Sequence, residues 1–98
     1  MNLSDITKRS RKAAAIIEDW ELPMWKRLHL SLQAYQGMEL SCLPGKVRKE
    51  LEGNLLEINQ VIAKYDIETF EDYEKIPAND LSKLLAIISV FAAQFLAK

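Results

Sequence analysis

Apolar residues recur along this chain at alternating spacings of three and four, which is the period of an amphipathic helix. The first such series comprises Leu3, Ile6, Ser10, Ala13, Ile17 and Trp20. Ser4 and Asp5 are residue types that cap helix N-termini well. The pattern therefore predicts a helix over residues 4–20.

A second helix is predicted over residues 23–36, because proline suits a first helical turn and Gly37 suits the residue after the last. Its buried stripe is expected to comprise Met24, Trp25, Leu28, Leu32 and Tyr35. The opposite, polar side is expected to hold Lys26, Arg27, Leu30, Gln33 and Ala34.

A third helix is predicted over residues 46–65, where the periodicity is cleanest. The repeating positions are Val47, Leu51, Asn54, Ile58, Val61 and Tyr65. Asn54 interrupts this apolar series. It is either a buried amide that sets the register of packing, as in coiled coils, or a rim residue that reaches water.

Residues 38–45 are expected to form a loop, and residues 69–75 a short helix capped by Thr69. Pro77 separates this short helix from a final one, for which Asn79 or Asp80 is the expected cap. Short connections favour antiparallel neighbours. The predicted fold is all-α: an antiparallel bundle of four main helices and one short helix, forming a single domain over residues 1–98.

The final helix is the most informative element, since only Ser89 and Gln94 are polar between residues 84 and 97. A helix that is apolar nearly all round must be covered on several sides. A small bundle would have difficulty covering Ile87 and Val90. The run is shorter than the roughly 20 residues that cross a bilayer, so no membrane span is expected.

The final helix also carries a line of small residues, namely Ser82, Ala86, Ser89, Ala93 and Ala97. Small side chains allow close approach of another backbone. We consider two partners for this line: the third helix of the same chain, or a second copy of the protein.

The formal net charge of −1 conceals a marked asymmetry. Residues 1–49 hold nine Lys or Arg against five acids, and residues 50–98 hold four against nine, so the halves carry +4 and −5. The halves can attract one another within one chain, or favour head-to-tail or antiparallel pairing. The total charge gives no long-range attraction to nucleic acid.

The strongest charge cluster consists of Lys8, Arg9, Arg11 and Lys12. Such a cluster can bind the phosphates of DNA or RNA. No recognition helix or aromatic stacking surface accompanies it, so a solvated helix face is the preferred interpretation.

The residue types needed for catalysis are scarce. His29 is the only histidine and Cys42 the only cysteine. His29 is expected on the surface, and a zinc site needs about four ligands, so we expect no metal, no cofactor and no enzyme. Because one cysteine cannot form an internal disulfide and no apolar run follows the basic N-terminus, a cytoplasmic setting is expected.

Trp20 and Trp25 flank the predicted turn at Leu22 and Pro23. Core packing is the preferred interpretation for both, but tryptophan is also a frequent interface anchor. The candidate partner-binding residues are Trp20, Met24, Trp25, Leu30, Ile87 and Val90. The sequence thus predicts a small non-catalytic binding or regulatory protein that forms a homodimer. The alternative is a nucleic-acid-associated regulator that uses the basic first helix.

Overall fold

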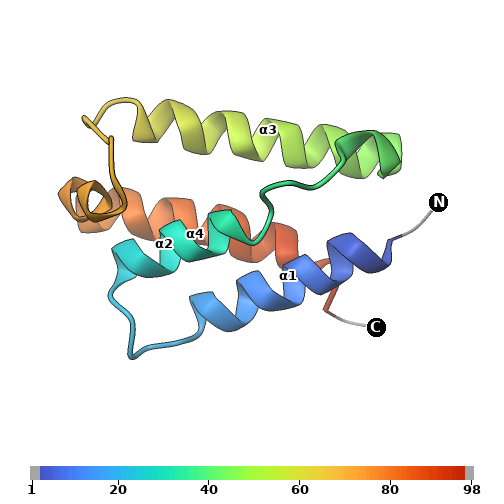
Figure 1. The fold of residues 1–98 in the computed structure, drawn as a ribbon, viewed down its shortest axis with the longest axis horizontal. Helices are drawn as coiled ribbons and strands as arrows, with labels where there is room; N and C mark the ends of the chain where they lie inside the picture. Colours follow the sequence, from blue (N-terminus) through green and yellow to red (C-terminus); the bar gives the residue numbers. More distant parts are fainter. Residues whose placement is uncertain (1–2, 97–98) are drawn as a thin grey trace.

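Four α-helices run up and down in an all-helical bundle, as the computed structural model of residues 3–96 shows (Figure 1). They are α1 (Ser4–Ile17), α2 (Met24–Gln33), α3 (Gly45–Ile62) and α4 (Ala78–Ala93), joined by the 3₁₀ turns η1 (Leu40–Cys42) and η2 (Phe70–Lys75). The predicted all-α antiparallel bundle is confirmed, and its short helix is η2. The turn η1 lies where only a loop was expected.

The α-helices end three or four residues earlier than the apolar periodicity predicts. At each C-terminus the chain continues in tighter turns, in which an amide donates to the carbonyl three residues back. Examples are the bonds from Tyr35 to Leu32, from Tyr65 to Ile62 and from Phe95 to Ala92. Such turns satisfy carbonyls that have no partner at a helix end. They also continue the apolar rhythm, so the pattern alone could not locate the end.

The predicted N-caps are correct for one element. Thr69 and Asp72 form a capping box at the start of η2. At α2, α3 and α4 the N-cap is instead a proline, and Leu3 precedes α1; none of these four residues makes a side-chain capping bond. Ser4, Asp5, Asn79 and Asp80 lie inside their helices, so these cap predictions are wrong.

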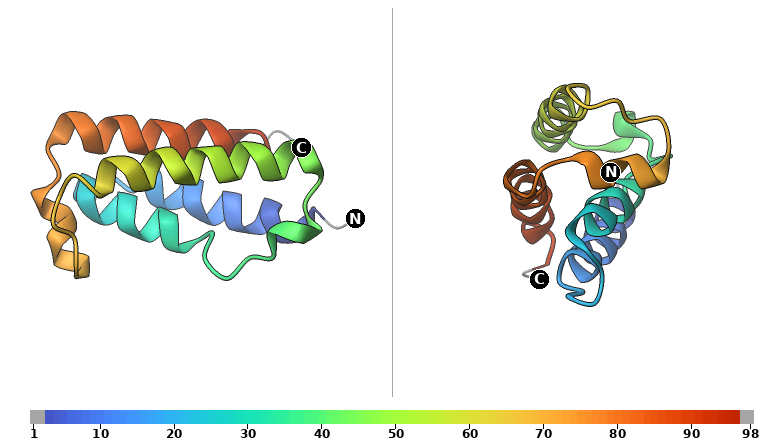
Figure 2. Two further views of the ribbon diagram at one scale, coloured as in Figure 1. Left: turned by 90° about the horizontal axis from the view of Figure 1, so that it is seen from above. Right: turned by 90° about the vertical axis from the view of Figure 1, so that its left-hand side faces the viewer.

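Helix α4 is the element around which the others assemble, since it contacts α1, α2 and α3. Its inner side supplies Leu81, Leu84, Leu85, Ile88, Phe91 and Ala92 to the core. These residues meet fully buried partners such as Ile6, Leu28 and Ile58. The end-on view in Figure 2 shows no element beyond the outer side of α4.

The polar side predicted for α2 is partly wrong, because Arg27 and Ala34 are buried. Arg27 can be buried since its guanidinium has partners: Nε donates to the carbonyl of Leu22 at 3.0 Å, and Nη1 to that of Ile17 at 3.3 Å. A cation there also complements the negative end of the α1 dipole. The arginine therefore joins the end of α1 to the start of α2.

No helix in residues 3–96 is long and apolar enough to cross a membrane. Ala97, which the sequence places in the final helix, lies outside the described residues, as does the side chain of Cys42.

Candidate protein-binding surface

The outer side of α4 is open to solvent although it is largely apolar. Val90 is 69 % exposed, and Ile87 is half-buried. The four small residues described on this helix, Ser82, Ala86, Ser89 and Ala93, are exposed as well. The small residues therefore do not pack against α3, and that interpretation is wrong.

A groove of about 370 Å³ runs along one side of this exposed ridge, between α4 and α3. Its lining consists of Glu50 and Asn54 from α3, with Lys83, Ala86, Ile87 and Val90 from α4. The floor is apolar and a carboxylate and an ammonium stand at its edges, as in surfaces that bind another protein through an apolar centre and a polar rim.

A second groove, of about 260 Å³, runs along the other side of α4, where α1 ends and α2 begins. Its lining includes Ile17, Trp20, Met24, Ser82, Leu85 and Ala86. Ala86 lines both grooves, so they flank one continuous ridge. We call this region the α4 surface and define it by Trp20, Met24, Ser82, Ala86, Ile87 and Val90.

Trp20 lies on this surface rather than in the core. It is 82 % exposed, and its ring lies 4.7 Å from the guanidinium carbon of Arg27. Helix α1 ends at Ile17, three residues before it. Asp19 then accepts a hydrogen bond from the amide of Glu21 at 3.1 Å, a local turn that competes with helix. The expectation that Trp20 packs in the core is wrong, because the helical face that would bury it has already ended.

The structure does not bring all six predicted binding residues together. Trp20, Met24, Ile87 and Val90 share the α4 surface. Trp25 instead packs on Phe70 of η2, with ring centroids 5.1 Å apart, and Leu30 is half-buried elsewhere on α2.

His29 extends the cluster around Trp25 and is not the surface residue that the sequence predicts. Its ring lies 4.4 Å from that of Phe70 and 4.8 Å from that of Tyr73. Burial lowers the pKa of His29 below its ordinary value of 6.5. Nδ1 is buried and has no hydrogen-bond partner among the described residues. These ring contacts attach η2 to α2.

The predicted basic face of α1 is divided in the structure. Lys8, Arg11 and Lys12 are exposed. Arg9 is not free, because Nε donates to Asp5 at 3.0 Å and Nη1 donates to the carbonyl of Ala34 at 3.2 Å. Arg9 thus holds the chain beyond α2 against α1.

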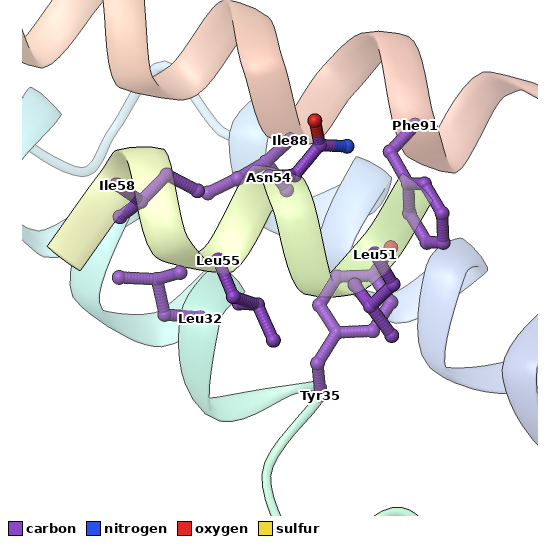
Figure 3. Close-up of a pocket in the computed structure, with 8 residues that line it drawn as sticks. All are labelled: Leu32, Tyr35, Leu51, Asn54, Leu55, Ile58, Ile88 and Phe91. Carbon is purple, nitrogen blue, oxygen red and sulfur yellow. The ribbon is translucent and has the colours of Figure 1, made fainter. Parts of the chain in front are cut away.

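Asn54 occupies the rim position that was one of its two predicted roles. It is half-buried at the edge of the groove between α3 and α4. Asn54 also lines a cavity of about 10 Å³, together with Leu32, Tyr35, Leu51, Leu55, Ile58, Ile88 and Phe91 (Figure 3). Figure 3 shows the amide pointing away from Leu32 and Leu55. The surface that faces this space is apolar although Asn54 and Tyr35 are among its lining residues. It offers no polar partners to a water molecule, so we assign the space to imperfect packing.

Within the described part of the chain, no group of three or more His, Cys, Asp or Glu residues is placed to hold a metal ion. Comparisons of the chain with protein-family models, with curated proteins and with solved structures found no match. The case for a function therefore depends on the α4 surface alone.

Proposed function

We propose that this protein is a small, non-catalytic binding protein of the cytoplasm that works through protein–protein contacts and associates with a second copy through the α4 surface. The observation that carries the proposal is that Val90 and Trp20 are both exposed and line the two grooves that flank the ridge of α4. Burial of a valine side chain contributes about 1.5 kcal/mol or more, and tryptophan is enriched among residues that dominate binding energies.

The basic face of α1 supports nucleic-acid binding less well. Arg9, near its centre, already donates hydrogen bonds to Asp5 and to a backbone carbonyl. A phosphate would have to displace these contacts or rely on Lys8, Arg11 and Lys12 alone.

Replacing Val90 with aspartate tests the proposal. Val90 is 69 % exposed, so the fold should tolerate the change, which circular dichroism checks. A carboxylate in the middle of an apolar interface would be buried without a partner, at a cost of several kcal/mol. We expect the unaltered chain to be dimeric by light scattering after size exclusion, and the V90D variant to be monomeric.

Leu56 provides the matched control. It is an apolar residue of similar exposure, 60 %, on α3, and it lines neither groove. At 100° per residue it lies about 200° around the helix from Asn54. The L56D variant should therefore remain dimeric; equal loss of association in both variants would contradict the role of the α4 surface.

A further inference from the structure

The outer edge of α4 presents one line of residues whose pattern is the same from either end. Lys83, Ile87, Val90 and Gln94 follow one another at spacings of four, three and four, so they lie along a single stripe. Read in either direction, the order is polar, apolar, apolar, polar. We infer that the second copy docks antiparallel, with its α4 packed against this α4 across a two-fold axis. This inference rests on the proposed self-association.

In an antiparallel helix pair, residues whose numbers have a constant sum lie opposite each other. The register that sets Lys83 opposite Gln94 also sets Ile87 opposite Val90. The two polar residues are eleven positions apart, or about 16 Å along the axis. A parallel pair would instead place each Lys83 beside its own copy, and like charges in direct apposition oppose binding.

Glu50 supplies the opposite charge that this arrangement requires. Its Oε1 accepts a hydrogen bond from Nε2 of Gln94 at 2.6 Å, so the carboxylate lies at the Gln94 end of the stripe. Lys83 is exposed at the other end and lines the same groove. Antiparallel docking therefore brings Lys83 near Glu50 of the partner subunit, and the two-fold axis repeats the pair.

The charge of the whole molecule favours the same orientation. One end of the bundle holds residues 3–12 and 39–52, with seven Lys or Arg against four acids. The other holds residues 18–27 and 64–80, with nine acids against four Lys or Arg. Helix α4 runs along the line between these ends (Figures 1 and 2). Antiparallel docking through α4 thus sets the basic end of each copy beside the acidic end of the other.

Charge reversal at the two positions tests this geometry. Lys83→Glu alone places two carboxylates together in each pair, and Glu50→Lys alone places two ammonium groups together. We expect each variant to dimerise about tenfold more weakly than the unaltered chain. In an equimolar mixture, with one variant labelled with heavy nitrogen, both pairs become complementary again. Native mass spectrometry should then show a ratio of mixed dimer to the two homodimers combined that is about tenfold above the statistical ratio of one to one.

Lys64→Glu and Glu52→Lys make the same charge changes outside the grooves. In an equimolar mixture of these two variants, mixed dimer and homodimers should form in the statistical ratio. A dimer that forms but shows no preference for mixing K83E with E50K would overturn the antiparallel geometry and leave the proposed function standing. A preference of the same size in the control mixture would also overturn it. A chain that stays monomeric at every concentration would overturn both proposals.

Discussion

Val90 and Trp20 carry the functional argument at the scale of single residues. A folded chain of this size can leave single apolar residues exposed without consequence. Here each side chain lines one of the two grooves that flank the exposed ridge of α4, and Ala86 lines both grooves. This arrangement, rather than either exposure alone, is typical of an interface.

His29 gives a prediction that is independent of association. Because burial lowers its pKa below 6.5, the unfolded chain takes up a proton before the folded one does. The contribution that neutral His29 makes to the free energy of unfolding should therefore be fully present above pH 6.5. It should be lost as the pH decreases toward the folded-state pKa. His29→Phe should remove this loss and, by eliminating the unpaired Nδ1, raise the free energy of unfolding at pH 7 by about 1 kcal/mol.

Urea unfolding at pH 7 and pH 5 measures both effects. Tyr73→Phe keeps the ring contact with His29 and serves as the control, which should retain the pH dependence of the unaltered chain. If the free energy of unfolding of the H29F variant fell between pH 7 and pH 5 by as much as that of the unaltered chain, the assignment to His29 would be contradicted.

Residue-level features were the hardest to predict from the sequence. The exposure of Val90 follows from counting apolar positions around one helix, and it was predicted. The burial of Arg27 depends on the carbonyls of Ile17 and Leu22, which lie outside its own helix. The partial burial of His29 likewise depends on η2 folding back onto α2, and no periodicity within α2 contains that information.

At the scale of elements, the sequence predicted each α-helix because its buried stripe is regular. The helix ends were not predictable to the same extent. A 3₁₀ turn after α1, α2 or α3 continues the apolar rhythm, so the pattern persists where the α-helical bonding has ended. The start of η2 was predictable, since Thr69 bonds to residues within its own turn.

Asp72 is the residue on which the start of η2 depends. Oδ2 accepts the amides of Glu68 at 2.9 Å and Thr69 at 3.0 Å, while Oδ1 lies 3.2 Å from Nζ of Lys75. The two amides, with the ammonium adding to their effect, hold the pKa of Asp72 at about 2, below its ordinary value of 3.8. A lowered pKa contributes stability above pH 3.8 that is lost as the pH falls toward 2.

The Asp72→Asn variant should therefore melt at a lower temperature than the unaltered chain at pH 5, and the difference should narrow between pH 4 and pH 2. Thermal unfolding followed by circular dichroism measures this. Glu71→Gln, which removes a neighbouring charge outside the capping box, should show a smaller difference at pH 5. A difference for D72N that is constant down to pH 2 would contradict the role assigned to the carboxylate.

At the scale of the whole molecule, the bundle carries a charge asymmetry along its long axis, and each of its ends contains residues from both halves of the sequence. The sequence showed that the two halves differ in charge, but it left open whether they face one another within the chain. In the folded chain the N-terminal parts of α1 and α3 share one end, while η2 and the turn after α1 share the other. Which charged segments share an end of the bundle is decided by the arrangement of the helices, and the local sequence pattern does not contain that information.

Sedimentation equilibrium of the unaltered chain, from micromolar to millimolar concentration, tests the central claim most directly. One chain has a mass of 11.2 kDa. If the α4 surface is covered by a second copy, the average mass should rise with concentration and level off at twice this value. A mass that stays at 11.2 kDa over the whole range would show that the exposed side of α4 does not bind its own copy.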